Sequence, residues 1–237
     1  MDREAELPGQ REPGAMRTDD YHVISCATVA EELRRLGVTE ERLTVLEFGL
    51  HAEPEKLKSE LKAAVEAVPG ECDILLGYGL CSNAVVSLSS PTHRLVIPKV
   101  DDCIALFLGS RAAHMERLRA EPGTYYLTKG WVEAQEGTVA EYERLVERYG
   151  PERALKVARV LFVNYTTVAL IDTGNYHMDE YRDFARAMAG FLELQFVEIP
   201  GSNRMLEMLL AGEWTDEFVV VEPGVEIRFE DFSTQLS

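Results

Sequence analysis

Four residues of types that bind metals follow successive predicted strands in the first half of this 237-residue chain: Cys26, His51, Cys81 and Cys103. They are 25, 30 and 22 residues apart, about one strand–helix unit each. Because the carboxyl ends of parallel strands share one edge of a sheet, we expect these side chains to converge. Thiolate and imidazole groups hold tetrahedral zinc, and three cysteines also suit a [4Fe–4S] cluster with one open iron. The pattern predicts a metal site and leaves the choice between these two cofactors open.

The alternative interpretation of the cysteines is ordinary packing, because free cysteine is among the most buried residue types. Cys72 fits that interpretation best, since it precedes its predicted strand and therefore lies at the opposite edge of the sheet. The other three cysteines all follow their strands, and their joint placement favours a shared site over independent burial.

The residues around two of these cysteines strengthen the prediction. Cys81 follows the segment Gly77-Tyr78-Gly79-Leu80, whose glycines allow a tight turn and a close approach to a ligand. Cys103 follows Asp101 and Asp102, either of which can cap a helix that begins there. In the first turn of that helix the dipole is expected to lower the pKa of the Cys103 thiol. We assign acid–base roles to Asp101, Asp102 and Tyr78.

A second group of polar residues lies in glycine-containing turns of the last third of the chain: Thr173, Asn175, Ser202 and Asn203. Such turns can present backbone N–H groups and a helix N-terminus to an anion, so these residues are predicted to bind the anionic part of a ligand. Helix capping is the simpler alternative. The histidines His22, His93 and His114 are expected at surface or boundary positions.

Strands and helices alternate along most of the chain, which predicts an α/β fold with parallel strands. The arrangement is either one doubly wound sheet or two similar βαβαβ lobes joined by a helical connector. We expect a disordered segment (1–20), a lobe carrying the Cys/His cluster (21–135), the connector (136–165) and a C-terminal α/β lobe (166–237). The stretch 123–131 is predicted to be a strand or an ordered loop, and 83–88 to begin a helix.

The composition excludes several classes of function. Lys and Arg total 24 against 41 Asp and Glu, a net charge of −17, which argues against nucleic acid or an anionic membrane as the main partner.

No apolar run reaches the roughly 18–20 residues of a membrane helix. The first 20 residues lack the apolar core of a secretory signal, so we expect a cytoplasmic protein with reduced cysteines. Motifs of dinucleotide-binding, P-loop, hydrolase and zincin proteins are absent from the sequence.

Several stretches together resemble the "domain of unknown function 1638" family of bacteria and archaea: Ile24-Ser25-Cys26, Leu50-His51, Gly77-Tyr78-Gly79-Leu80-Cys81, Asp101-Asp102-Cys103, Gly123-Thr124-Tyr125-Tyr126-Leu127 and Gly130-Trp131. The resemblance covers roughly residues 21–225, and Ala27 stands where the family pattern suggests glycine. Members of the family often accompany corrinoid-dependent methyltransferase systems. By association, the resemblance implies one-carbon or methyl-transfer metabolism, with corrinoid methyltransferase components as partners.

A more distant similarity is to quinolinate synthase and the diphthamide-forming radical enzymes, which place three cysteines from different α/β units around one [4Fe–4S] cluster. Here all three candidate cysteines come from one half of the chain, so zinc remains an equal alternative. The leading hypothesis is therefore a metal-dependent enzyme, such as a transferase, that acts on a small anionic molecule. The alternative is a small-molecule binding or accessory protein without catalysis, in which the cysteines are structural.

Overall fold

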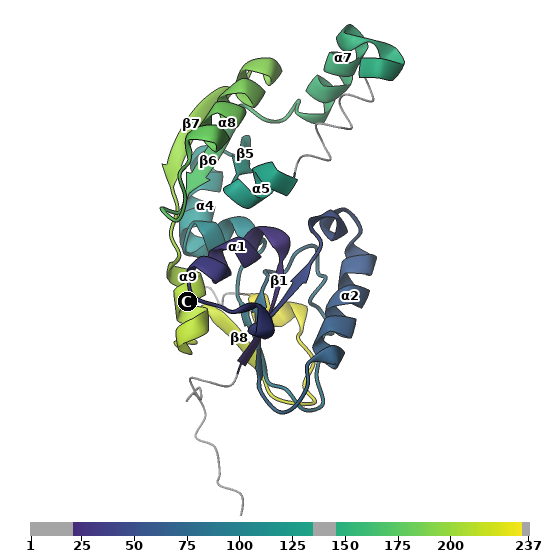
Figure 1. Ribbon diagram of the computed structural model, residues 1–237, viewed down its shortest axis with the longest axis vertical. Coiled ribbons are helices and arrows are strands. Elements are labelled where there is room, and N and C mark those ends of the chain that lie inside the picture. Colours follow the sequence, from purple (N-terminus) through teal and green to yellow (C-terminus); the bar gives the residue numbers. More distant parts are fainter. Residues whose placement is uncertain (1–20, 135–145, 234–237) are drawn as a thin grey trace, which may run out of the picture.

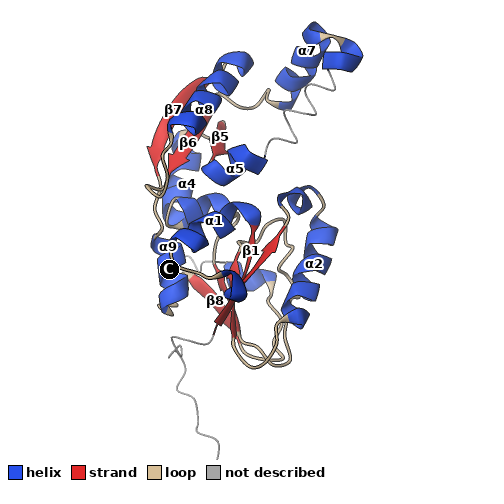
Figure 2. Ribbon diagram, viewed as in Figure 1, coloured by secondary structure: helices blue, strands red, loops and turns tan. Residues whose placement is uncertain are grey.

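The computed structural model describes residues 21–134 and 146–233 (Figure 1). The predicted disordered segment (1–20) lies outside these residues, as does the first part of the predicted connector. The described chain forms two α/β lobes, each with its own sheet, as Figure 2 shows in red and blue. None of the described helices is long and apolar enough to cross a membrane.

The first lobe is built on a five-stranded sheet, sheet A. Its strands, in spatial order, are β2 (Leu43–Leu46), β1 (Tyr21–Cys26), β3 (Asp73–Gly77), β4 (Leu95–Pro98) and β8 (Phe218–Val221). The first four run parallel and β8 is antiparallel to β4. Every residue of β3 and β4 is buried, as expected for inner strands covered on both faces.

Helices cover both faces of sheet A, with α2 on one side and α9 on the other (Figure 1). Short 3₁₀ turns complete the loops around the sheet. The bounds of these elements are α1 (Ala27–Arg35), η1 (Glu40–Arg42), η2 (Phe48–Ala52), α2 (Pro54–Ala67), α3 (Cys103–Phe107), α4 (Arg111–Ala120), α9 (Arg204–Ala211) and η3 (Phe229–Phe232). The main apolar core lies between these helices and the sheet.

The second lobe has a parallel three-stranded sheet of β5 (Thr124–Leu127), β6 (Thr167–Asp172) and β7 (Gln195–Pro200), with β6 in the centre. Helix α8 (Asp179–Leu192) packs on β6 and β7, and α5 (Lys129–Ala134) packs beside α8. A smaller apolar core joins them. Helix α7 (Pro151–Leu161) projects from this lobe at one end of the molecule (Figure 1).

Three local predictions differ from the structure. The final strand, β8, belongs to sheet A rather than to the C-terminal lobe, and α9 also packs on sheet A. The sequence of a short valine-rich strand does not indicate which sheet it joins. The prediction therefore assigned β8 to the same lobe as the elements that precede it in the chain. Residues 81–87 form successive turns and not the start of a helix. The 123–131 stretch forms a strand, β5, and the start of α5 as part of the second lobe, although it was predicted within the first lobe (21–135).

The two lobes meet where α5 packs against α1. A Cβ atom at Gly130 would lie 2.8 Å from the Cα of Thr28, so only glycine permits this approach. The contact is next to Cys26, because Thr28 is in the first turn of α1. The second lobe therefore packs directly beside the carboxyl end of β1.

Candidate functional site

Three cysteines occupy the carboxyl ends of three neighbouring strands of sheet A. Cys26 ends β1 and is the N-cap residue of α1, and Cys103 begins α3 after β4. Cys81 follows β3 by four residues. All three are free and buried. The parallel strand order β1-β3-β4 therefore places all three cysteines at one edge of sheet A.

Backbone hydrogen bonds join the two loops that carry Cys81 and Cys103. The N–H of Leu80 donates to the carbonyl oxygen of Val100 at 2.8 Å. The N–H of Cys81 donates to the carbonyl oxygen of Asp101 at 3.0 Å. A Cβ on Gly79 would lie only 2.7 Å from the Val100 oxygen, so the loops can approach this closely only with glycine there. The pairing of β3 with β4 therefore continues beyond the strands and brings the two cysteines together.

The backbone at Cys81 is strained. Cys81, Ser82 and Asn83 have φ angles of 44°, 58° and 67°, a run of left-handed residues without glycine. Each such residue costs of order 1 kcal/mol, and such strain is concentrated at functional sites. The surrounding loop therefore holds Cys81 in the cluster against its local backbone preference.

Burial keeps the thiols protonated. Burial raises the pKa of Cys26 and Cys103, and it raises the pKa of Cys81 to about 12. Other cysteines of the cluster and Asp102 raise the pKa values of Cys81 and Cys103 further. The expected lowering of the Cys103 pKa by its helix is wrong, because desolvation outweighs the dipole of a five-residue helix. The Cys26 sulfur also lies 3.0 Å from the Thr28 hydroxyl.

Tyr78 lies among the three thiols and is 1% exposed. Its hydroxyl has no hydrogen-bond partner among the described residues. Burial, with the cysteines contributing, raises the pKa of Tyr78 well above its usual value. The ring of half-buried His51, on η2, lies 6.3 Å from the Tyr78 ring, and burial lowers the pKa of His51. At neutral pH the three thiols, the Tyr78 hydroxyl and the His51 ring are therefore uncharged.

The two predicted aspartates have different surroundings. Asp102 caps α3, accepting a hydrogen bond from the Ile104 N–H at 2.9 Å, and its carboxylate lies 3.7 Å from Nδ1 of His114. Asp101 is exposed and pairs with Arg111 at 3.2 Å. His93 and His114 are both buried, contrary to their expected surface or boundary positions. Of the two, Asp102 is the carboxylate that acts electrostatically on Cys81 and Cys103.

The cluster is not a closed metal site as it stands. Across residues 21–134 and 146–233, no group of three or more His, Cys, Asp or Glu side chains is arranged so that it could hold a metal ion. The thiols of Cys26 and Cys81 act electrostatically on Cys103, and a cysteine sulfur changes position by rotation about χ1 alone. A metal ion bound there would also have to displace the thiol protons.

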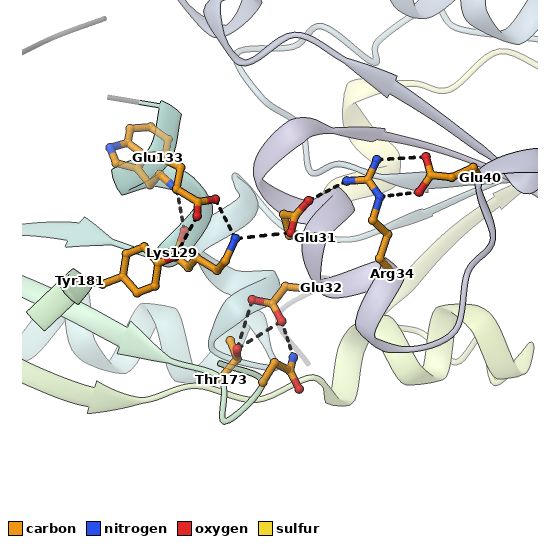
Figure 3. A network of polar contacts seen from close by, with 11 residues as sticks. Glu31, Glu32, Arg34, Glu40, Lys129, Glu133, Thr173 and Tyr181 are labelled. Atoms are coloured by element: carbon orange, nitrogen blue, oxygen red, sulfur yellow. Dashed lines mark hydrogen bonds and ion pairs between the residues drawn. The ribbon is translucent and has the colours of Figure 1, made fainter. Parts of the chain in front are cut away.

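The four polar residues of the second lobe lie apart from the cysteines, at the ends of β6 and β7. Figure 3 shows the Thr173 hydroxyl beside both oxygens of Glu32, at 3.1 and 3.2 Å, and the Asn175 amide donates to the same carboxylate. Asn203 exchanges two 3.1 Å hydrogen bonds with Asn175. The Ser202 hydroxyl accepts from the N–H of Arg204 at the start of α9.

Glu32 is the centre of this second cluster and was not predicted from the sequence. It is buried on α1, and desolvation raises the pKa of its carboxyl, partly offset by the hydrogen bonds from the second lobe. Thr173 and Asn175 therefore already hydrogen-bond to a carboxyl group of the protein itself. No sequence signal distinguishes Glu32 from Glu31, the adjacent acid, because the periodicity of a nine-residue helix does not define its buried face sharply.

A pocket of about 430 Å³ opens beside the Glu32 cluster at the junction of the lobes. It is lined by Arg35, Lys129, Gly174, Asn175, Tyr176, His177 and Tyr181. The Lys129 ammonium lies 2.7 Å from Glu133 and 3.4 Å from Glu31, as Figure 3 shows, and 5.0 Å from the centre of the Tyr176 ring. The Arg35 guanidinium also lies over that ring, at 5.2 Å.

The fold and the site together define a two-lobed α/β protein with a buried cysteine–tyrosine cluster at the carboxyl ends of parallel strands. The family described as "Protein of unknown function (DUF1638)" matches residues 45–210, more than half of the chain, and the protein belongs to that family. The match includes His51, Cys81 and Cys103, whereas Cys26 precedes it. No curated protein and no solved structure matches the chain.

Proposed function

We propose that the protein binds zinc or a [4Fe–4S] cluster through Cys26, Cys81 and Cys103 and uses it on a small molecule. The observation that carries this proposal is the convergence of three thiols from three strand ends in one buried cluster. The left-handed backbone at Cys81 supports a role beyond packing, because strain of this kind is concentrated at functional sites.

The donor chemistry fits the proposed cofactors. Thiolates suit both zinc and iron–sulfur clusters, and three of them leave the fourth position for a substrate or for His51. The Tyr78 hydroxyl, buried without a partner among the described residues, is a donor for an atom bound in this cluster. Reduced thiols also fit a cytoplasmic location.

The reaction class we rank first is methyl or one-carbon group transfer. A bound zinc ion with an open position supplies a Lewis acid that activates a substrate thiol for alkylation. Asp102 is placed to accept a proton near Cys81 and Cys103, and Tyr78 to donate a hydrogen bond. Corrinoid methyltransferase components are the partners we propose on the basis of the family resemblance.

We propose that the substrate enters from the pocket at the junction of the lobes, whose lining includes neither Tyr78 nor any of the three cysteines. The 430 Å³ pocket there has Arg35 and His177 in its lining and suits a small anionic molecule. Burial of the cysteines restricts water around them, which strengthens every charge interaction with a bound substrate.

A second candidate function is small-molecule binding without catalysis. It is favoured by the absence, in the part of the chain that the structure describes, of three side chains arranged to hold a metal ion. Under this proposal the cysteines are buried packing residues, and the pocket at the lobe junction is the binding site.

Elemental analysis and the visible spectrum of protein purified without oxygen distinguish the two candidates. A brown protein with a broad absorption band supports an iron–sulfur cluster, and a colourless one with about one zinc per chain supports zinc. Cys81→Ser and Cys103→Ser are each expected to abolish metal binding. Cys72→Ser is the control, because Cys72 lies at the opposite end of β3 and should leave the metal content unchanged. A metal-free wild-type protein would leave only the second candidate.

A further inference from the structure

Helix α7 carries an apolar stripe that is exposed among residues 21–134 and 146–233. Val157, Val160 and Leu161 are 43, 71 and 70% exposed, and Val163 just beyond the helix is 73% exposed. The three helical residues are spaced by three and four positions, so they lie on one face. Apolar side chains this exposed and this close together mark an interaction surface.

The charge of α7 is opposite to that of the whole chain. The helix contains three basic residues and one acidic residue, a net charge of +2, in a protein of net charge −17. Arg153 and Lys156 are exposed, and Arg159 pairs with Glu193. The surface that covers this helix must therefore combine apolar side chains with negative charge.

The C-terminal segment has this complementary character. Val220, Val225 and Phe229 are 39, 43 and 55% exposed. Residues 222–231 contain four acidic side chains and one arginine, a net charge of −3. This segment is part of the first lobe, whereas α7 projects from the far end of the second lobe (Figure 1). The two surfaces are well separated along the long axis of one molecule.

We propose that the protein forms a twofold dimer in which α7 of each copy docks on the C-terminal segment of the other. In a twofold dimer of elongated molecules, each end of one copy lies beside the opposite end of the other copy. The two contacts between α7 and the C-terminal segment therefore form together. The apolar stripe supplies the buried area, with Phe229 as the aromatic anchor. The opposite charges set the orientation, because pairing α7 with a second α7 would bring two positive surfaces together.

Charge-reversed variants of the full chain test the proposal in sedimentation velocity experiments. The first variant is Arg153→Glu with Lys156→Glu, and the second is Glu226→Lys with Glu230→Lys. Each alone brings like charges together at both contacts of its homodimer and is expected to associate at least roughly tenfold more weakly than the wild type. An equimolar mixture of the two is expected to restore the dimer, because every contact in the mixed pair then joins opposite charges.

The same experiment excludes the alternatives. If α7 paired with a second α7, the Glu226→Lys, Glu230→Lys variant would dimerise like the wild type, and the proposal would be wrong. A wild-type chain that stays monomeric up to high micromolar concentration would also overturn it, including the case in which α7 instead binds anionic lipid vesicles. Leu161→Ser is expected to weaken the dimer, whereas Val45→Ser, at an apolar side chain that is 37% exposed elsewhere on the surface, should not.

Discussion

The carboxyl ends of the parallel strands carry different side chains in the two sheets. In sheet A they carry three buried thiols and a tyrosine hydroxyl that has no partner among the described residues. In the second sheet they carry hydroxyl and amide groups that hydrogen-bond to Glu32 and to each other. The same topological position thus holds buried thiols and the Tyr78 hydroxyl in one lobe and the hydrogen-bonded Glu32 network in the other. The Tyr126 and Tyr176 hydroxyls of the second lobe are also buried without a partner among the described residues.

This difference distinguishes a candidate ligand-binding site from a structural contact between the lobes. Buried polar groups are normally hydrogen-bonded, so an unsatisfied one needs an explanation such as a missing ligand. Glu32 has its ligands already, and they come from the other lobe. We therefore keep the cysteine cluster, with its left-handed backbone at Cys81, as the proposed place for chemistry, and we propose that the Glu32 cluster connects the two lobes.

The largest effect on stability is expected from removing the Asn175 amide, which hydrogen-bonds to Glu32 across the lobe contact. In Asn175→Leu, the Glu32 carboxylate loses its amide donor while it stays buried, which costs about 3 kcal/mol of unfolding free energy. Asn164→Leu is the control, because Asn164 is exposed. Urea unfolding of both variants checks this; a loss for Asn175→Leu no larger than that for Asn164→Leu would show that the network does not stabilise the lobe contact.

A smaller effect, visible in its pH dependence, is expected from Glu32→Gln, because a glutamine can still accept the hydrogen bonds. The pKa of Glu32 is raised in the folded protein, so the folded state holds this proton more tightly than the unfolded state does. Glu32 ionisation therefore lowers stability as the pH rises from the unfolded pKa through the folded pKa. The variant lacks this loss.

The measurement is the unfolding free energy of wild type and Glu32→Gln between pH 4 and 8. Relative to the wild type, the variant should gain stability as the pH rises and then level off. A constant difference over this range, or a difference of the opposite slope, would contradict the raised pKa. Because both proteins share all other titrating groups, the difference isolates Glu32.

Two hydroxyl deletions compare the clusters directly. Thr173→Val removes a hydroxyl that donates to Glu32 and is expected to cost about 1 kcal/mol. Tyr78→Phe removes a hydroxyl that has no partner among the described residues, so in metal-free protein it should be neutral or stabilising by up to about 1 kcal/mol. Thermal unfolding of metal-free protein gives both values. Equal losses in the two variants would mean that the Tyr78 hydroxyl has an internal partner and that the contrast between the lobes is wrong.

The smallest effect is expected at Ser82. Its φ of 58° is easier for glycine, so Ser82→Gly should raise stability by about 0.5 kcal/mol. Ser59→Gly in the middle of α2 should lower it by a similar amount. Opposite signs in urea unfolding identify strain in the loop that carries Cys81. A loss in both variants would show that this loop is not strained.

The strands that precede Cys26, Cys81 and Cys103 could be predicted because each is a short apolar run. Their parallel direction could be predicted because strands alternate with helices along the chain. The lobe assignment of β8 could not, since partner choice depends on contacts distant in sequence. The same limit hid the Glu32 network, whose donors are more than 140 positions away. It also hid the burial of His114, which depends on how α4 packs.

The antiparallel pairing of β4 with β8 joins Leu95 to Val221, so the entire second lobe is inserted between two neighbouring strands of the first. During synthesis, β4 is made long before its partner and keeps an open backbone edge until the ribosome has passed Val221. An apolar strand with an open edge is a template for pairing with other chains. A chain released before Phe218 would contain every cysteine of the cluster and still present this edge, so nascent and truncated forms are the ones most in need of a chaperone.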